Sequence, residues 1–305
     1  MPSLTYRRMA DIAAWTKLKP NFCEVDPSTL AISAKTARPC INDNTALILA
    51  VHPIVNCCDV DGLVALSKEK NIPLLFDSVE SVYESTADGK IGGFGNAEVF
   101  SLHASKLLNG FEGGYVTTNE PGLFKQLALM RGFGFHGADS ITVTGGMNAK
   151  LNEVHAAMAL ASLDGINEQV ALNRRRYYAY KRFLAGIPGL RLLKFDESHR
   201  TAYKNIVVEL LDEWPLTRSD TIKILNEENI LARAYYSPPL HQKTMAYDCI
   251  AADLPLTDYL SCRYLNLPCG QLVSNDDITD IVELLSFISK HADLIRDRFQ
   301  QNGVA

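Results

Sequence analysis

Three polar residues stand where buried strands are expected to end: Asp77, Ser101 and Lys106. Asp77 closes the apolar run IPLLFD, while Ser101 and Lys106 lie at and just beyond the end of the run AEVFSLH. A lysine in that position is either a solvated loop charge or a reactive amine, and its spacing alone favours the solvated charge. Ligands of open α/β sheets bind at the carboxyl ends of strands, so the convergence of the three residues favours the reactive amine.

The elements that must position these residues follow from the apolar pattern. TALILAVHP (Thr45–Pro53) and IPLLFD (Ile72–Asp77) predict two buried strands, and between them Asp59 is a plausible N-cap for a helix with apolar residues at helical spacing. A strand, a helix and a strand within about thirty residues form a βαβ unit, which predicts a parallel, mostly buried sheet. AEVFSLH and GGYVTT predict two more strands, and EPGLFKQLALMRGFG predicts a helix with an early proline and a glycine stop.

The second half of the chain has a different pattern. A long helix is expected from Asn148 to about Ala185, interrupted by Gly165. After it, YKNIVVEL predicts a strand, SDTIKILNEEN a helix opened by Ser219 or Asp220, and DDITDIVELLSFISKHADLIRDRF one closing helix. We therefore expect a large α/β domain over residues 1–165, a connecting long helix over 166–190 and a small C-terminal α/β domain over 191–305.

Composition excludes several classes of protein. The 305 residues are 47% hydrophobic, enough for one large or two ordinary domains. The net charge is −5 without a dense basic block, so nucleic acid is not an expected partner, and no apolar run is long enough to cross a membrane. The seven cysteines lack zinc spacing and the histidines are scattered. These features predict reduced thiols, no metal site and a cytoplasmic location.

The three strand-end residues suit an aldehyde cofactor. A Schiff base needs one desolvated lysine amine. If the aldehyde is pyridoxal phosphate, an acid must also hold the pyridine nitrogen protonated, so that the ring can accept electrons. The phosphate needs hydroxyl or backbone donors, and an aromatic ring would stack on the pyridine face. Lys106, Asp77 and Ser101 have the right types for three of these roles.

The motifs FDSVES, GGFGNAEVFSLHASK and FEGGYVTT resemble, in this order and spacing, the pyridoxal-phosphate-dependent sugar aminotransferases of the DegT/DnrJ/StrS family. The resemblance covers nearly the whole chain, including the segments PNFCEVDPSTLAIS and YYSPPLH. It implies a fold type I large domain with a mostly parallel sheet and a smaller C-terminal α/β domain. The implied reaction is transamination of a keto group on a nucleotide-linked deoxysugar or a related cyclitol, with glutamate or glutamine as amino donor.

The resemblance also implies roles for single residues. Lys106 forms the Schiff base and later moves the proton, Asp77 pairs with the pyridine nitrogen, and Ser101 donates to the phosphate. Tyr6 matches the aromatic that stacks on the ring. The alternatives are structural: Asp77 as an N-cap, Ser101 as an ordinary strand serine, and Tyr6 as a core aromatic.

Three further polar residues have weaker assignments. Asn148 matches an asparagine that reaches the phosphate of the neighbouring subunit, which implies a homodimer with shared active sites; alternatively it caps the long helix. His241 matches a substrate-side position only weakly and is more easily explained as a structural or solvated residue. His103, three residues before Lys106, is expected to pack or to support the site indirectly.

The chain departs from the family pattern in two places. Glu80 stands where the family usually has histidine or glutamine against the phenolic oxygen of the cofactor, and two like charges there are costly. Glu80 is therefore protonated, turned away, or used to tune the cofactor.

Relatives also carry roughly sixty to eighty residues before the position of Tyr6, including a Gly-Thr turn that holds the phosphate. This favours one alternative function, a truncated homologue acting as a binding or regulatory protein. Related dehydratases replace the lysine with histidine, so Lys106 argues against that activity.

Overall fold

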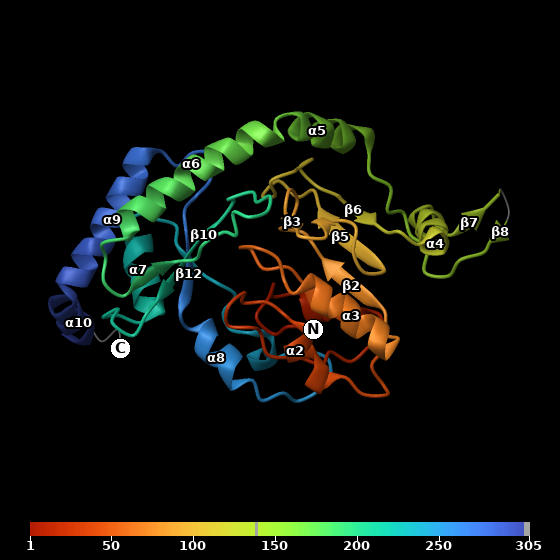
Figure 1. Ribbon diagram of the computed structural model, residues 1–305, viewed down its shortest axis with the longest axis horizontal. Coiled ribbons are helices and arrows are strands. Elements are labelled where there is room, and N and C mark those ends of the chain that lie inside the picture. Colours follow the sequence, from red (N-terminus) through yellow and green to blue (C-terminus); the bar gives the residue numbers. More distant parts are fainter. Residues whose placement is uncertain (138–139, 302–305) are drawn as a thin grey trace.

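The computed structural model describes residues 1–137 and 140–301 and contains two four-stranded sheets (Figure 1). The first sheet has the order β1-β2-β5-β6. Its strands are β1 (Ile48–Val51), β2 (Leu74–Asp77), β5 (Ala97–Ser101) and β6 (Gly114–Thr117). β1, β2 and β5 run parallel, and β6 runs antiparallel to β5. The expected large, mostly parallel sheet is thus a small mixed sheet in the described chain, because no helix lies between β5 and β6 to carry the chain back across the sheet.

The βαβ unit that places Asp77 is confirmed. Helix α3 (Val60–Lys70) connects β1 to β2, and the Asp59 carboxylate caps it by accepting from the Gly62 N–H at 3.1 Å. The α3 side chains Val60, Leu63 and Leu66 are buried in one cluster with residues of β1 and β2. This burial fixes β2, and therefore its terminal residue Asp77, against the helix layer.

The expected long helix is two helices. α5 (Glu153–Asp164) and α6 (Ile166–Leu184) meet at Gly165, and in Figure 1 they form one curved arm over the molecule. α5 begins after Asn152, whose side chain accepts from the His155 N–H at 2.9 Å, so the prediction of a helix from Asn148 was wrong. α6 lies beside the C-terminal helix α9, whereas α5 extends past the first sheet and has no buried residue.

The second sheet is antiparallel throughout, with the order β11-β12-β10-β9. Its strands are β9 (Leu190–Leu192), β10 (Ile206–Leu210), β11 (Arg233–Ala234) and β12 (Tyr264–Leu267). Helix α7 (Arg218–Glu227) is capped by the Thr217 side chain, not by Ser219 or Asp220 as expected. The predicted closing helix is divided at His291 into α9 (Asn275–Lys290) and α10 (Ala292–Gln301).

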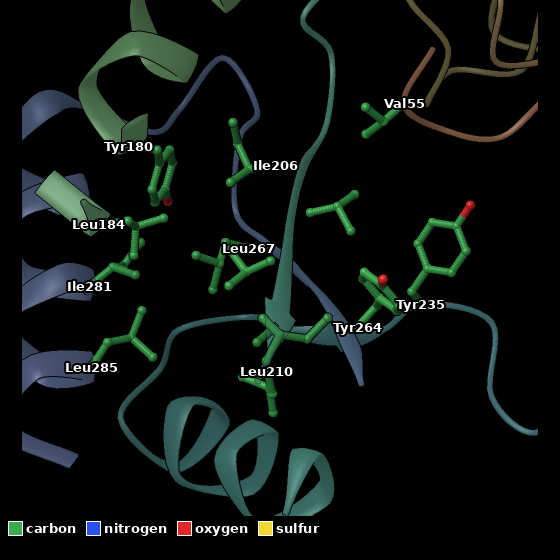
Figure 2. Close-up of a cluster of buried hydrophobic side chains, with 14 of the residues drawn as sticks. Val55, Tyr180, Leu184, Ile206, Leu210, Tyr235, Tyr264, Leu267, Ile281 and Leu285 are labelled. Atoms are coloured by element: carbon green, nitrogen blue, oxygen red, sulfur yellow. The ribbon is translucent and has the colours of Figure 1, made fainter. Parts of the chain in front are cut away.

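The main buried cluster surrounds β10 (Figure 2). Tyr180 and Leu184 reach it from α6, and Ile281 and Leu285 reach it from α9. The same cluster includes Leu4, Val25 and Val55 from the first part of the chain. The second sheet therefore packs against the N-terminal segment as well as against its own helices.

Further helices and strands complete the described chain. They are α1 (Met9–Trp15), α2 (Ala34–Ala37), η1 (Arg38–Cys40), β3 (Ser85–Thr86), β4 (Gly89–Lys90), α4 (Pro121–Arg131), β7 (Phe135–His136), β8 (Ser140–Ile141), η2 (Leu240–Gln242) and α8 (Pro255–Ser261). Among the described residues, no helix combines the length and apolar character that crossing a membrane requires. The domain boundaries at 165 and 190 stay a prediction, and the last residues of the expected small domain, 302–305, lie outside the described part.

Candidate functional site

The structure brings Asp77, Ser101 and Lys106 to one edge of the first sheet. β2 ends at Asp77 and β5 ends at Ser101, and Asp77 lies opposite Val99 in the parallel register. Lys106 follows β5 in a turn closed by its own N–H, which donates to the His103 carbonyl at 2.9 Å. The Lys106 side chain is only 15% exposed. The lysine is therefore not a solvated loop charge.

Glu80 lies between two lysines. Lys106 Nζ donates to Glu80 Oε1, and Lys204 Nζ donates to Glu80 Oε2 at 2.7 Å. Burial raises the pKa of Glu80, but the charges of Lys204 and Lys106 outweigh it and hold that pKa below its usual value. Glu80 is therefore ionised and directed at Lys106 rather than protonated or turned away.

Asp77 is a buried acid. Burial raises its pKa to about 6, and the charge of Glu80 acts in the same direction. A hydrogen bond from the Val79 N–H to Oδ1, at 3.1 Å, and the charge of Lys106 oppose the rise. A carboxyl in such surroundings gains stability when a further cation approaches it, and a protonated ring nitrogen is such a cation.

Ser101 is the last residue of strand β5, and a turn follows it. Its backbone pairs with Gly114 of β6, and its Oγ accepts from the His103 N–H at 3.2 Å. His103 itself does not pack: its side chain is 52% exposed, and its Nδ1 shares a hydrogen bond with Ser105 Oγ at 2.8 Å. Of the two alternatives expected for His103, packing is therefore wrong and indirect support of the site stays a prediction, while the Ser101 hydroxyl lies at the same edge as Lys106.

Two glycines explain how β6 approaches Ser101. Gly113 has a φ of +121°, and a Cβ on Gly114 would lie 2.6 Å from the carbonyl oxygen of Phe100. We expect Gly114→Ala to destabilise the folded chain by about 1–3 kcal/mol, the usual cost of overpacking. Urea unfolding measures this, with Gly122→Ala in α4 as the matched control, because nothing lies within 4 Å of a Cβ there. Equal stability of the two variants would contradict the expectation.

Tyr6 is exposed to 51% and is thus not a core aromatic. Burial raises the pKa of the neighbouring Tyr236 hydroxyl, and the charges of Glu80, Asp77 and Tyr6 act on it in the same direction. Tyr6 is therefore close enough to act electrostatically on Tyr236, as the two acids are, and half of its surface is exposed. This position is compatible with stacking on a bound ring.

The side chains of Asn148 and His241 form hydrogen bonds with residues other than Asp77, Glu80 and Lys106. Asn148 is exposed, and its Oδ1 accepts from Lys150 Nζ at 2.5 Å, so it does not cap the helix that Asn152 begins. His241 shares a hydrogen bond with Ser3 Oγ through Nδ1 at 2.7 Å, and its Nε2 lies 3.0 Å from Asp258 Oδ1. The His241 side chain is therefore part of a structural connection between the N-terminal segment and α8.

Lys204 is the site residue that the sequence reasoning missed. It lies two residues before β10, in the segment YKNIVVEL, for which the sequence predicts a strand. Its contact with Glu80 joins residues 124 positions apart in the sequence. A cation two residues before a fully buried strand was the one available signal.

The donor set fits pyridoxal phosphate. A buried acid, a largely buried amine and a hydroxyl lie at one sheet edge, with an exposed aromatic in the same surroundings. Asp77 would hold the ring nitrogen, Lys106 the aldehyde carbon and Ser101 the phosphate. Among the described residues, no group of three or more histidines, cysteines or acids is placed to hold a metal ion.

Comparisons with a solved structure and with a family model place this fold among the aminotransferases. The chain superposes on the crystal structure of DesI in the presence of its TDP-sugar product with a TM-score of 0.92 and 31% identity, covering 98% of this chain and 76% of that one. A family model, the DegT/DnrJ/EryC1/StrS aminotransferase family, matches residues 1–286. The chain belongs to this family of pyridoxal-phosphate-dependent enzymes.

Curated relatives are similar over most of this chain. Protein Rv3402c of Mycobacterium tuberculosis is 29% identical, over 92% of this chain and 69% of its own length. GDP-perosamine synthase of Caulobacter vibrioides is 27% identical, over 93% of this chain and 77% of its own length. The chain therefore spans about 70–77% of the length of these two relatives.

Proposed function

We propose that this chain transfers an amino group to the keto group of a nucleotide-linked deoxysugar, or of a related cyclitol, with glutamate or glutamine as donor. The observation that carries the proposal is the acid–amine pair at one sheet edge, Asp77 and Lys106, in a chain of this family. The names of its relatives support the substrate class: they include GDP-perosamine synthase and a dTDP-4-amino-4,6-dideoxy-D-glucose transaminase of Shigella dysenteriae.

Each residue has a defined task in this reaction. When bound, pyridoxal phosphate supplies an electron-accepting ring that stabilises negative charge on the substrate carbon. Asp77 holds the ring nitrogen protonated through its carboxylate. Lys106 would hold the aldehyde carbon through Nζ, and its amine would take a proton from the substrate carbon and return it. Ser101 donates its hydroxyl to the phosphate, and Tyr6 fixes the tilt of the ring.

The test is a transfer assay on the purified chain. Pyridoxal phosphate, glutamate or glutamine, and a set of TDP- and GDP-linked keto sugars are combined, and aminated nucleotide sugars are detected by mass spectrometry. Donor-dependent amination supports the proposal. A folded chain that takes up no pyridoxal phosphate contradicts it and favours the binding or regulatory alternative.

The free cysteines are compatible with the reducing cytoplasm, where we place the reaction.

We also propose that the chain forms a homodimer through the surface that includes α5. Val154, Leu160 and Leu163 of α5 are 68%, 64% and 47% exposed, and Phe124 of α4 is 64% exposed. Apolar surface of this kind marks interaction sites, and a second copy would also bring Asn148 toward a neighbouring site. In analytical ultracentrifugation we expect Leu160→Glu to be monomeric and Lys35→Glu, at an exposed position in α2, to remain dimeric. Sedimentation of the wild-type chain as a monomer would contradict the proposal.

A further inference from the structure

We propose that Lys204 is a positioning residue of this site: through its ion pair with Glu80 it fixes that carboxylate and opposes its charge, which keeps the Lys106 amine able to lose its proton. The inference rests on the proposed function, because that function assigns Lys106 the role of nucleophile. It adds a residue that precedes β10, an inner strand of the second sheet, to a site built on the first sheet.

The geometry assigns one carboxylate oxygen to each lysine. Oε1 of Glu80 accepts from Lys106 and Oε2 accepts from Lys204, the latter at 2.7 Å. The side chains of Glu80, Lys106 and Lys204 are 15%, 15% and 18% exposed, so water screens their charges only weakly. The Lys204 backbone is itself held, because its carbonyl accepts from Cys269 Sγ at 2.9 Å. Glu80 therefore cannot turn toward Lys106 alone without breaking a partly buried ion pair.

Several titratable groups face Glu80 from the elements packed around it. They are Asp77 at the end of β2, Lys106 after β5, Lys204 before β10, Tyr235 and Tyr236 after β11, and Cys269 after β12. Burial raises the pKa values of both tyrosines and of Cys269, which keeps these three neutral near pH 8. The charges that act on Glu80 from this set are thus those of Asp77 and the two lysines.

The chemistry of the amine explains why a second cation matters. An amine adds to an aldehyde carbon only as the free base: a C–N bond forms, and the carbonyl oxygen departs as water with the two amine protons. A carboxylate paired with Lys106 alone would stabilise the ammonium form. A positive charge on the other oxygen of the same carboxylate offsets that stabilisation. Removal of Lys204 should therefore make the Lys106 amine less reactive.

The experiment measures Lys106 without any cofactor. The chain is labelled with acetic anhydride over a range of pH, and labelling of Lys106 is quantified by peptide mass spectrometry, with exposed Lys35 as internal reference. In Lys204→Met we expect the labelling midpoint of Lys106 to rise by about one pH unit, which lowers labelling at pH 8 about tenfold. Capture of pyridoxal phosphate at pH 8 should slow by the same factor. Lys204→Arg keeps the charge and should behave as the wild type does.

The combination with Glu80→Gln completes the test. The double variant Glu80→Gln/Lys204→Met should lose the defect of Lys204→Met, because the Glu80 carboxylate that Lys204 opposes is then absent. If Lys204→Met does not fold, Glu80→Gln alone is compared with the double variant, and its midpoint should be the lower one, since Lys204 then acts on Lys106 unopposed. An unchanged midpoint in either comparison overturns the inference. The proposed function fails differently, since it fails when wild-type Lys106 carries no borohydride-stable pyridoxal phosphate.

Discussion

Lys106→Ala is expected to abolish covalent capture of pyridoxal phosphate and to lower amino transfer by about 10²–10⁴-fold, because the nucleophile and the proton-transfer group are lost together. Lys106 lies at the carboxyl edge of the first sheet beside Asp77 and Glu80, and its side chain is 15% exposed. The measurement is incubation with pyridoxal phosphate, reduction with borohydride and mapping of the labelled peptide.

The matched control for this substitution is Lys90→Ala, which removes an exposed lysine from the hairpin strand β4. It should capture pyridoxal phosphate as the wild type does. Capture on Lys204 in the Lys106→Ala variant, at the wild-type level, would contradict the assignment and make Lys204 the nucleophile. The two lysines share one carboxylate, so the peptide map is needed and total label alone is insufficient.

Asp77→Asn is expected to stabilise the cofactor-free chain at pH 8 while impairing its function. The folded-state pKa of Asp77 is about 6, above its ordinary value of 3.8. Because the pKa of Asp77 is higher in the folded state than in the unfolded state, folding favours the protonated carboxyl. The favourable contribution of this carboxyl to the free energy of unfolding is fully present below about pH 4 and is lost as pH rises through 6. Two pH units correspond to about 3 kcal/mol, so the stabilisation by asparagine should approach about 3 kcal/mol at pH 8 and vanish near pH 4.

Urea unfolding at pH 4 and pH 8 measures this difference. Asp43→Asn, at an exposed position before β1, is the control and should show no such dependence on pH. Affinity for pyridoxal phosphate should fall about ten- to a hundredfold in Asp77→Asn, because an amide replaces the charged partner of the ring nitrogen. A variant less stable than the wild type at pH 8 would show that the Asp77 carboxylate supports the fold.

The sequence predicted the parts of the fold that local patterns determine. Two continuous apolar runs and the N-cap Asp59 were enough to predict β1, α3 and β2, and hence the position of Asp77. The extent of the first sheet was not predictable in this way, because strand pairing depends on contacts between distant residues. For the same reason the contact of Lys204 was not predictable, since its partner Glu80 is 124 positions away.

Some local predictions failed because the signal was ambiguous. Thr217, Ser219 and Asp220 are all good capping residues, and only the Thr217 side chain, accepting from the Asp220 N–H at 3.1 Å, caps α7. The apolar pattern continues across His291, so the break between α9 and α10 leaves no mark in the sequence. Asn148 was the expected start of the long helix, but Asn152 is of the same residue type, and the structure shows that Asn152 caps α5.

The buried cluster around β10 has a consequence for the cooperativity of the molecule. Because Leu4, Val25 and Val55 pack in the same cluster as residues of α6, α9 and the second sheet, the N-terminal segment cannot leave this cluster without exposing the interior around β10. The ion pair of Glu80 with Lys204 also joins the first half of the chain to the second half. We therefore expect the N-terminal segment and the second sheet to unfold together, with their backbone amides exchanging with solvent through the same opening.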